Sequence, residues 1–187
     1  QLYSIHFERG QELAARLRKL DVDPERVAWL VNSHLHFDHV GGNAQLPNAT
    51  LVVQRREWEA AAEPDLRARN HYDPRDYDLG HARRLVDGEH DLFGDGSVCC
   101  VPTPGHTPGH QSLRVRLPSG DVVLTADACY LRSALEAMQL PPVLHDREEM
   151  LASYRRLRAL EAAGARLYFG HDPAPWAHDP QAALEIS

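Results

Sequence analysis

The sequence predicts a layered α/β protein that forms one domain. Short apolar segments rich in β-branched residues alternate with segments whose leucines recur every three or four positions, so strands alternate with helices. The chain has 187 residues, of which 43% are hydrophobic, and can bury a single core. Its polar motifs follow the ends of predicted strands, where layered α/β proteins usually carry their sites. We therefore expect residues 1–187 to form a single domain.

Apolar periodicity places the individual elements. Helices are expected at 11–20, 55–62 and 147–163. Strands are expected at 27–32, 51–54, 83–86, 90–93, 97–101, 111–117, 121–126 and 166–169. Residues 63–80 contain proline, aspartate and arginine without a period. We expect a long surface loop there, either a functional lid or an insertion without a role.

Charge and composition argue against several classes of protein. A net charge of −7 repels nucleic acid, and the arginines within 155–158 have the spacing of a solvated helix face. No apolar run approaches the length of a membrane span. Cys99, Cys100 and Cys129 form no even framework, so we expect free thiols, a reducing compartment and a cytoplasmic location.

Twelve histidines are the main anomaly, because neutral imidazole is a common metal ligand. Four ligand-type side chains occur within six residues, followed by two glycines. His34 and His36 would point the same way and bind one ion. Asp38 and His39 lie beyond a bend and would face a second ion, since one ion cannot accept adjacent side chains on both sides of a turn.

Three more side chains complete this set. His106 lies in a proline-rich loop, Asp127 follows a predicted strand, and His171 follows the last strand. Both oxygens of Asp127 can bind, so it would bridge two ions. The predicted metal ligands are therefore His34, His36, Asp38, His39, His106, Asp127 and His171. Nitrogen and oxygen ligands without thiolate suit two zinc ions, with manganese, cobalt or iron as alternatives.

The other histidines show weaker signals. His110 is either a residue that hydrogen-bonds a metal ligand or a packed core residue. The rest have no convergent partner in the sequence; they are His6, His71, His81, His90, His145 and His178. Of these, His71 is the one to check for contact with substrate.

The motifs 34–42, 103–113 and 169–171, together with Asp127, resemble those of the metallo-β-lactamase superfamily. The resemblance covers almost the whole chain and implies a four-layer αβ/βα sandwich with two metal ions between the sheets. Within the superfamily the chain is most similar to N-acyl-homoserine lactonases, because Tyr130 stands three residues after Asp127 and Asp172 follows His171. That family has further strands before its first motif, so we expect the sandwich to lack part of its N-terminal sheet.

The resemblance implies a hydrolase that opens a lactone ring, with an N-acyl-homoserine lactone, a quorum signal, as the expected substrate. A hydroxide bridging the metals would attack the carbonyl. Tyr130 would contact that carbonyl, and Asp38 would pass a proton to the departing alkoxide. The alternatives are a thioester hydrolase of the glyoxalase II type, a broader esterase or lactonase of the same fold, and a metal-binding protein without activity. We expect neither a nucleic-acid nor a membrane partner and leave a homodimer open.

Overall fold

The computed structural model describes residues 8–174 and, in that part of the chain, contains two β-sheets. The smaller sheet is parallel, has the order β1-β2-β3, and consists of β1 (Trp29–Val31), β2 (Thr50–Gln54) and β3 (Arg83–Val86). The larger sheet has the order β4-β5-β6-β7-β8 and consists of β4 (His90–Asp91), β5 (Val98–Pro102), β6 (Gln111–Leu117), β7 (Gly120–Ala126) and β8 (Arg166–Phe169). Its neighbours are antiparallel except for β7 and β8, which are parallel.

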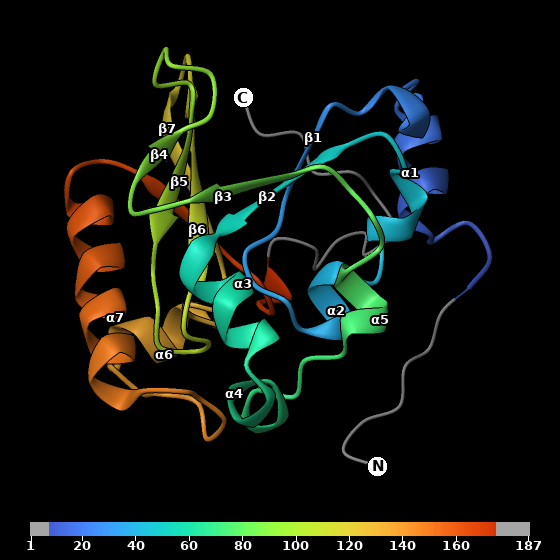
Figure 1. Ribbon diagram of the computed structural model, residues 1–187. Coiled ribbons are helices and arrows are strands. Elements are labelled where there is room, and N and C mark those ends of the chain that lie inside the picture. The colour runs from blue at the N-terminus through green and yellow to red at the C-terminus, as the bar shows by residue number, and fades with distance from the viewer. Residues whose placement is uncertain (1–7, 175–187) are drawn as a thin grey trace.

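Helices flank both sheets (Figure 1). They are α1 (Leu13–Lys19), α2 (Phe37–Val40), α3 (Arg55–Ala62), α4 (Pro64–Arg69), α5 (Pro74–Tyr77), α6 (Arg132–Glu136) and α7 (Arg147–Ala162), with 3-10 turns η1 (Pro24–Arg26) and η2 (Asn43–Gln45). Figure 1 shows α6 and α7 on one side of the larger sheet and α2, α3 and α5 on the other. Within residues 8–174 no helix combines the length and apolar character that crossing a membrane requires.

Strand β2 shows how the layers are stacked. Leu51 and Val53 are fully buried in a cluster that includes the apolar face of α3. Val52, between them, points to the opposite face and packs with Cys100 of the larger sheet, as expected for side chains that alternate along a strand. A third cluster joins β7 and β8 to α6 and α7. The layers are therefore helices, larger sheet, smaller sheet and helices, which confirms the four-layer αβ/βα sandwich.

Most predicted elements are confirmed to within a few residues. Helix α3 has the predicted bounds, and α7 ends one residue earlier than expected. Arg155 and Arg158 are exposed on α7, in agreement with a solvated face. The cysteines are free and buried; they are Cys99, Cys100 and Cys129. The single domain of residues 1–187 and the missing part of the N-terminal sheet stay predictions, and residues 1–7 and 175–187 lie outside the described residues.

The prediction of a long surface loop over 63–80 is wrong, because two short helices occupy it. Glu63 accepts hydrogen bonds from two backbone amides at the start of α4, and Asp73 accepts one at the start of α5. Each helix also has proline in its first turn, where no amide hydrogen is needed. Tyr72 and Tyr77 are buried, so the segment is part of the core. Helices of six and four residues are too short to show an apolar period.

Two other short helices were not predicted either. Asp38 and His39 lie in α2, which was expected to be a loop, and α6 follows β7. These helices have four and five residues, again fewer than two turns. Of the two, α2 matters more for the site. The chain is extended up to His36 and helical from Phe37, so the side chains of Asp38 and His39 point in a different direction from those before them.

Gly105 lies where the loop after β5 passes the first turn of α7. Its φ is +126°, and a Cβ there would lie 2.3 Å from the backbone nitrogen of Met150. The loop therefore contacts α7 through backbone, which only glycine permits. Gly164, after α7, has a φ of +103° but would direct a Cβ into open space.

Replacing each of these two glycines by alanine distinguishes the cost of backbone strain from the cost of steric overlap with a neighbouring helix. Gly164→Ala should lower the free energy of unfolding by about 1 kcal/mol through backbone strain alone. Gly105→Ala should lower it by about 1–3 kcal/mol more, because the new methyl group overlaps α7. Urea denaturation of both variants measures the difference, and equal losses would show that the close approach at Gly105 carries no energy.

Candidate metal centre

The candidate centre lies where strands of both sheets end. The segment after β1 carries His34, and the loop after β5 carries His106. Asp127 follows β7 and His171 follows β8; these strands are parallel neighbours, so both side chains leave the same edge. Gln111 links the sheets near this point, since its side-chain nitrogen donates to the carbonyl of Asn32 at 2.8 Å.

Three imidazoles form one half of the centre. His36 Nδ1 lies 3.0 Å from His34 Nε2 and 3.0 Å from His106 Nε2. His36 Nε2 lies 2.8 Å from the carbonyl oxygen of Asn70, so it carries the hydrogen and leaves Nδ1 as a lone pair. His34 Nδ1 lies 3.0 Å from the Ser33 hydroxyl. Three ring nitrogens thus face a common point, as in a zinc site.

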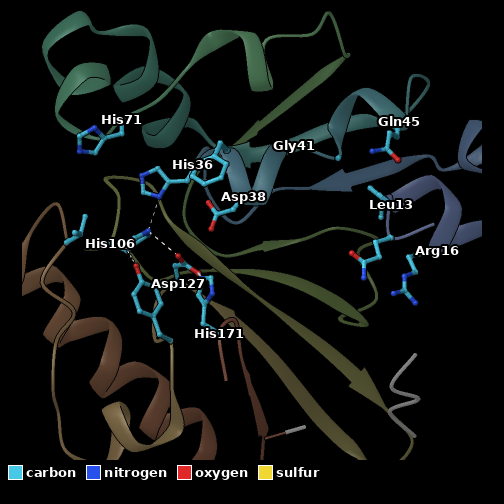
Figure 2. A pocket seen from close by; sticks show the side chains of 15 residues that line it. Leu13, Arg16, His36, Asp38, Gly41, Gln45, His71, His106, Asp127 and His171 are labelled. Carbon is cyan, nitrogen blue, oxygen red and sulfur yellow. Dashed lines mark hydrogen bonds and ion pairs between the residues drawn. The ribbon is translucent and has the colours of Figure 1, made fainter. Parts of the chain in front are cut away.

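Asp127 lies between this half and a second one. Its Oδ2 is 3.3 Å from His106 Nε2, on the first half. Its Oδ1 is 3.2 Å from His39 Nε2 and 3.2 Å from His171 Nε2, on the second half. Asp38 Oδ2 lies 3.6 Å from His39 Nε2. The two carboxylate oxygens therefore face different sets of donors. Figure 2 shows His36, His106 and His171 directed toward Asp127.

The backbone before Asp127 is unusual. Ala126 has a φ of +46°, and the pairing of β7 with β8 shifts register between Leu124 and Ala126. A residue with a side chain rarely adopts this conformation outside constrained sites. Gly170 packs against this turn, since a Cβ there would lie 3.1 Å from the Ala126 carbonyl. The bulge directs the Asp127 carboxylate into the centre.

Burial keeps the imidazoles of the first half neutral. It lowers the pKa of His34 and of His36, and it lowers the pKa of His106 to about 4. Burial acts in the opposite direction on Asp127, but the imidazoles of His171 and His39 hold its pKa below the usual range. Neutral imidazoles and an ionised carboxylate are the protonation states that metal ligands require.

Two buried atoms at the centre lack hydrogen bonds. His39 Nε2 and Asp127 Oδ1 are 3.2 Å apart, yet neither makes a hydrogen bond of suitable geometry in the described part of the chain. Buried polar atoms are normally paired, so each such exception requires a reason. A cation between them supplies one. The nitrogen and oxygen donor set therefore fits divalent metal.

All seven residues predicted as metal ligands converge. Within residues 8–174, the groups near enough to share an ion comprise only these: His34, His36, Asp38, His39, His106, Asp127 and His171. His110 accepts a hydrogen bond from the backbone amide of Asp127 at 3.1 Å and is also fully buried, so it combines the two roles expected from the sequence. The other described histidines are outside these groups; they are His71, His81, His90 and His145. His6 and His178 lie outside the described residues.

A pocket of about 1160 Å³ opens beside the centre. Tyr130, which was predicted to contact substrate, lines this pocket. It lies between two histidines. Its hydroxyl is 3.4 Å from His106 Nδ1, and its ring centroid is 5.0 Å from that of His171. His71 also lines the pocket (Figure 2). The pocket therefore connects Tyr130 and the donor cluster with solvent.

Sequence reasoning missed two residues that hydrogen-bond a ligand or the backbone beside one. Asn70 uses its carbonyl oxygen to bind His36, and no sequence pattern marks a backbone carbonyl. Glu57 is fully buried and accepts a hydrogen bond from the amide of Leu35, which stands between His34 and His36. A signal for Glu57 was present, because Ala60 and Ala61, three and four residues later, form the buried face of α3. A carboxylate on that face requires partners.

Comparison with known proteins agrees with this geometry. A family model described as "Metallo-beta-lactamase superfamily" matches residues 5–171. The chain belongs to this superfamily. Membership implies divalent metal, which is the ion type that the donor cluster fits.

Several relatives within the superfamily are N-acyl homoserine lactonases. The enzyme AttM of Azorhizobium caulinodans is 43% identical over 169 residues, covering 87% of this chain and 64% of AttM. AiiA of Bacillus thuringiensis subsp. kurstaki is 35% identical, covering 83% of this chain and 60% of AiiA. An N-acyl homoserine lactone hydrolase structure with N-hexanoyl-L-homoserine at its metal centre matches with a TM-score of 0.78 and 30% identity, covering 95% of this chain and 68% of that one. The chain thus spans less than two thirds of AttM and of AiiA.

Divalent metal should stabilise the fold through this cluster. Adding zinc to chelator-treated protein should raise the thermal midpoint, because at 100 times the dissociation constant each site contributes about 2.7 kcal/mol. His106→Ala should lose at least half of this rise, because it removes a donor from one of the two halves of the cluster. His90→Ala, in β4 outside the cluster, should retain it. Differential scanning calorimetry measures the shifts, and an equal rise in both variants would place the metal elsewhere.

Proposed function

We propose that the protein hydrolyses N-acyl-homoserine lactones at a centre that holds two divalent cations. The observation that carries this proposal is the cluster of six further donor side chains around the carboxylate of Asp127, with Tyr130 beside it in an open pocket. The names of the relatives support the choice of lactone over other esters. A small-molecule substrate suits a pocket of this size.

The proposed ligand sets follow the geometry. His34, His36 and His106 would hold one cation. Asp38, His39 and His171 would hold the other, and Asp127 would contribute one oxygen to each. When bound, such cations polarise a carbonyl and lower the pKa of water toward neutrality. We propose zinc, because the donors are nitrogen and oxygen without thiolate; manganese, cobalt and iron accept the same donors.

Two side chains of this chain would then act on the substrate. Tyr130 lines the pocket with its hydroxyl 3.4 Å from His106 Nδ1, and this hydroxyl would donate a hydrogen bond to the lactone carbonyl oxygen as negative charge develops there. The Asp38 carboxylate is partly exposed to the same pocket and would carry a proton to the ring oxygen as the ester bond breaks. The product would be the open-chain hydroxy acid.

Apolar side chains would receive the acyl chain of the substrate. Leu13, Phe37 and Val143 line the pocket, and Phe37 and Val143 are exposed there. Burying such surface against a hydrocarbon chain favours binding by about 25 cal/mol per Å². A homodimer and a cytoplasmic location stay predictions.

A substrate panel tests the proposed reaction. Zinc-loaded protein should hydrolyse N-hexanoyl-homoserine lactone faster than a glutathione thioester or a chromogenic cephalosporin, as followed by proton release for the lactone and absorbance for the other two. His106→Ala and Asp127→Ala should each lose bound metal and should also lose lactone turnover. Preference for the thioester would favour the glyoxalase II type of activity instead.

The role of Tyr130 has its own test. Tyr130→Phe should lower kcat for the lactone about 10²-fold, since loss of one donor to a developing oxyanion typically costs 10²–10³. Its metal content should stay unchanged. Tyr168→Phe, in β8 and outside the pocket lining, is the matched control and should retain full kcat. An unchanged kcat in Tyr130→Phe would exclude this hydroxyl from the reaction.

A further inference from the structure

Glu57 is a fully buried carboxylate that the proposed reaction does not use. It lies on α3, and both of its oxygens accept hydrogen bonds. Oε1 accepts from the Leu35 amide at 3.0 Å and from the Tyr72 hydroxyl at 2.8 Å. Oε2 accepts from the Gly109 amide at 2.8 Å. Burying a carboxylate is costly, so three donors at these distances indicate a site built around it.

Each of these donors belongs to a segment that positions an imidazole. Leu35 stands between His34 and His36 in the chain. Gly109 lies three residues after His106 in the same loop. Glu57 therefore joins the two segments that bring the three ring nitrogens of the first half together, although these segments are far apart in sequence.

The third donor extends this link to the residue that orients His36. Tyr72 lies two residues after Asn70, whose carbonyl oxygen accepts the hydrogen of His36 Nε2. The ring centroids of Tyr72 and His36 are 5.7 Å apart. The segment between α4 and α5 is thus connected to His36 both directly and through Glu57.

Backbone packing leaves little freedom around this carboxylate. A Cβ at Gly109 would lie 2.2 Å from the backbone nitrogen of Glu57, so the loop rests on the first turn of α3. A shift of the loop relative to α3 would break the hydrogen bond at Oε2. A shift of the segment after β1 would break the hydrogen bond from Leu35 to Oε1.

We infer that Glu57 is a positioning residue that sets the affinity of the cation held by His34, His36 and His106. None of its hydrogen bonds reaches the segments of the second half, at Asp38, His39 and His171, in the described part of the chain. The inference rests on the proposed metal centre. It adds that one half of that centre depends on a carboxylate that touches no cation.

Glu57→Gln is the decisive variant. Its amide has nearly the size of the carboxylate, and its oxygen can still accept from Leu35 and Tyr72. Its NH₂ group, however, would face the amide hydrogen of Gly109, so two donors would oppose each other. Tyr72→Phe removes one hydroxyl donor and keeps the ring. Glu59→Gln makes the same chemical change at an exposed position of the same helix.

The measurement is a cobalt(II) titration of chelator-treated protein, followed by visible absorption and by competition with a chromogenic chelator. Wild-type protein should bind two equivalents. Glu57→Gln should bind one equivalent 10- to 100-fold more weakly, as is typical when a partner of a metal ligand is lost, and the other within about threefold of wild type. Tyr72→Phe should show a smaller selective loss, and Glu59→Gln none.

The outcomes separate this inference from the proposals on which it rests. Unchanged cobalt affinities in Glu57→Gln would overturn the inference. Equal weakening of both equivalents would also overturn it, if the weakening matches a decrease in the free energy of unfolding of the metal-free protein. Wild-type protein that binds no cobalt would instead overturn the metal centre. If Glu57→Gln does not fold, the selectivity of Tyr72→Phe decides: weakening of one equivalent supports the inference, and wild-type affinities contradict it.

Discussion

The carboxylate of Asp127 is the contact on which the candidate centre depends. It is buried, and ring nitrogens of four histidines lie within 4.0 Å of it: His34, His39, His106 and His171. Charge in such surroundings is unstable unless opposite charge accompanies it. The bulge in β7 and the positive φ of Ala126 show that the backbone departs from ordinary geometry to deliver this group.

Backbone packing, more than side-chain packing, holds the loop that carries His106. This loop touches α7 at Gly105 and α3 at Gly109, and neither position has room for a Cβ. Contacts of this kind cannot adjust by changing rotamers, so the loop has a fixed path between the two helices. Gln111, at its end, adds hydrogen bonds to Asn32 and Ser33 in the segment that follows β1. The position of the His106 ring therefore follows from the placement of two helices.

The sequence predicted the strands and the seven donors because both leave strong local signals. Alternating apolar residues mark β6, a short apolar run of β-branched residues and leucine marks β7, and closely spaced histidines mark the segment 34–39. The short helices α4 and α5 were not predicted, because they are too short to show an apolar period and are stabilised by the capping residues Glu63 and Asp73. Contacts such as Glu57 with Gly109 join residues 52 positions apart, which no local pattern reveals. Conversely, the charge of Glu57 on the apolar face of α3 was a readable sign of a buried partner.

The two sheets, which are the inner layers of the sandwich, both contribute to the centre. His34 and His36 follow a strand of the smaller sheet, whereas Asp127 and His171 follow strands of the larger one. A cation bound by both sets would act as a crosslink across the middle of the molecule. Release of the cation and separation of the two sheets would then be coupled equilibria. The stability of the packing between the sheets would therefore increase with the occupancy of the centre.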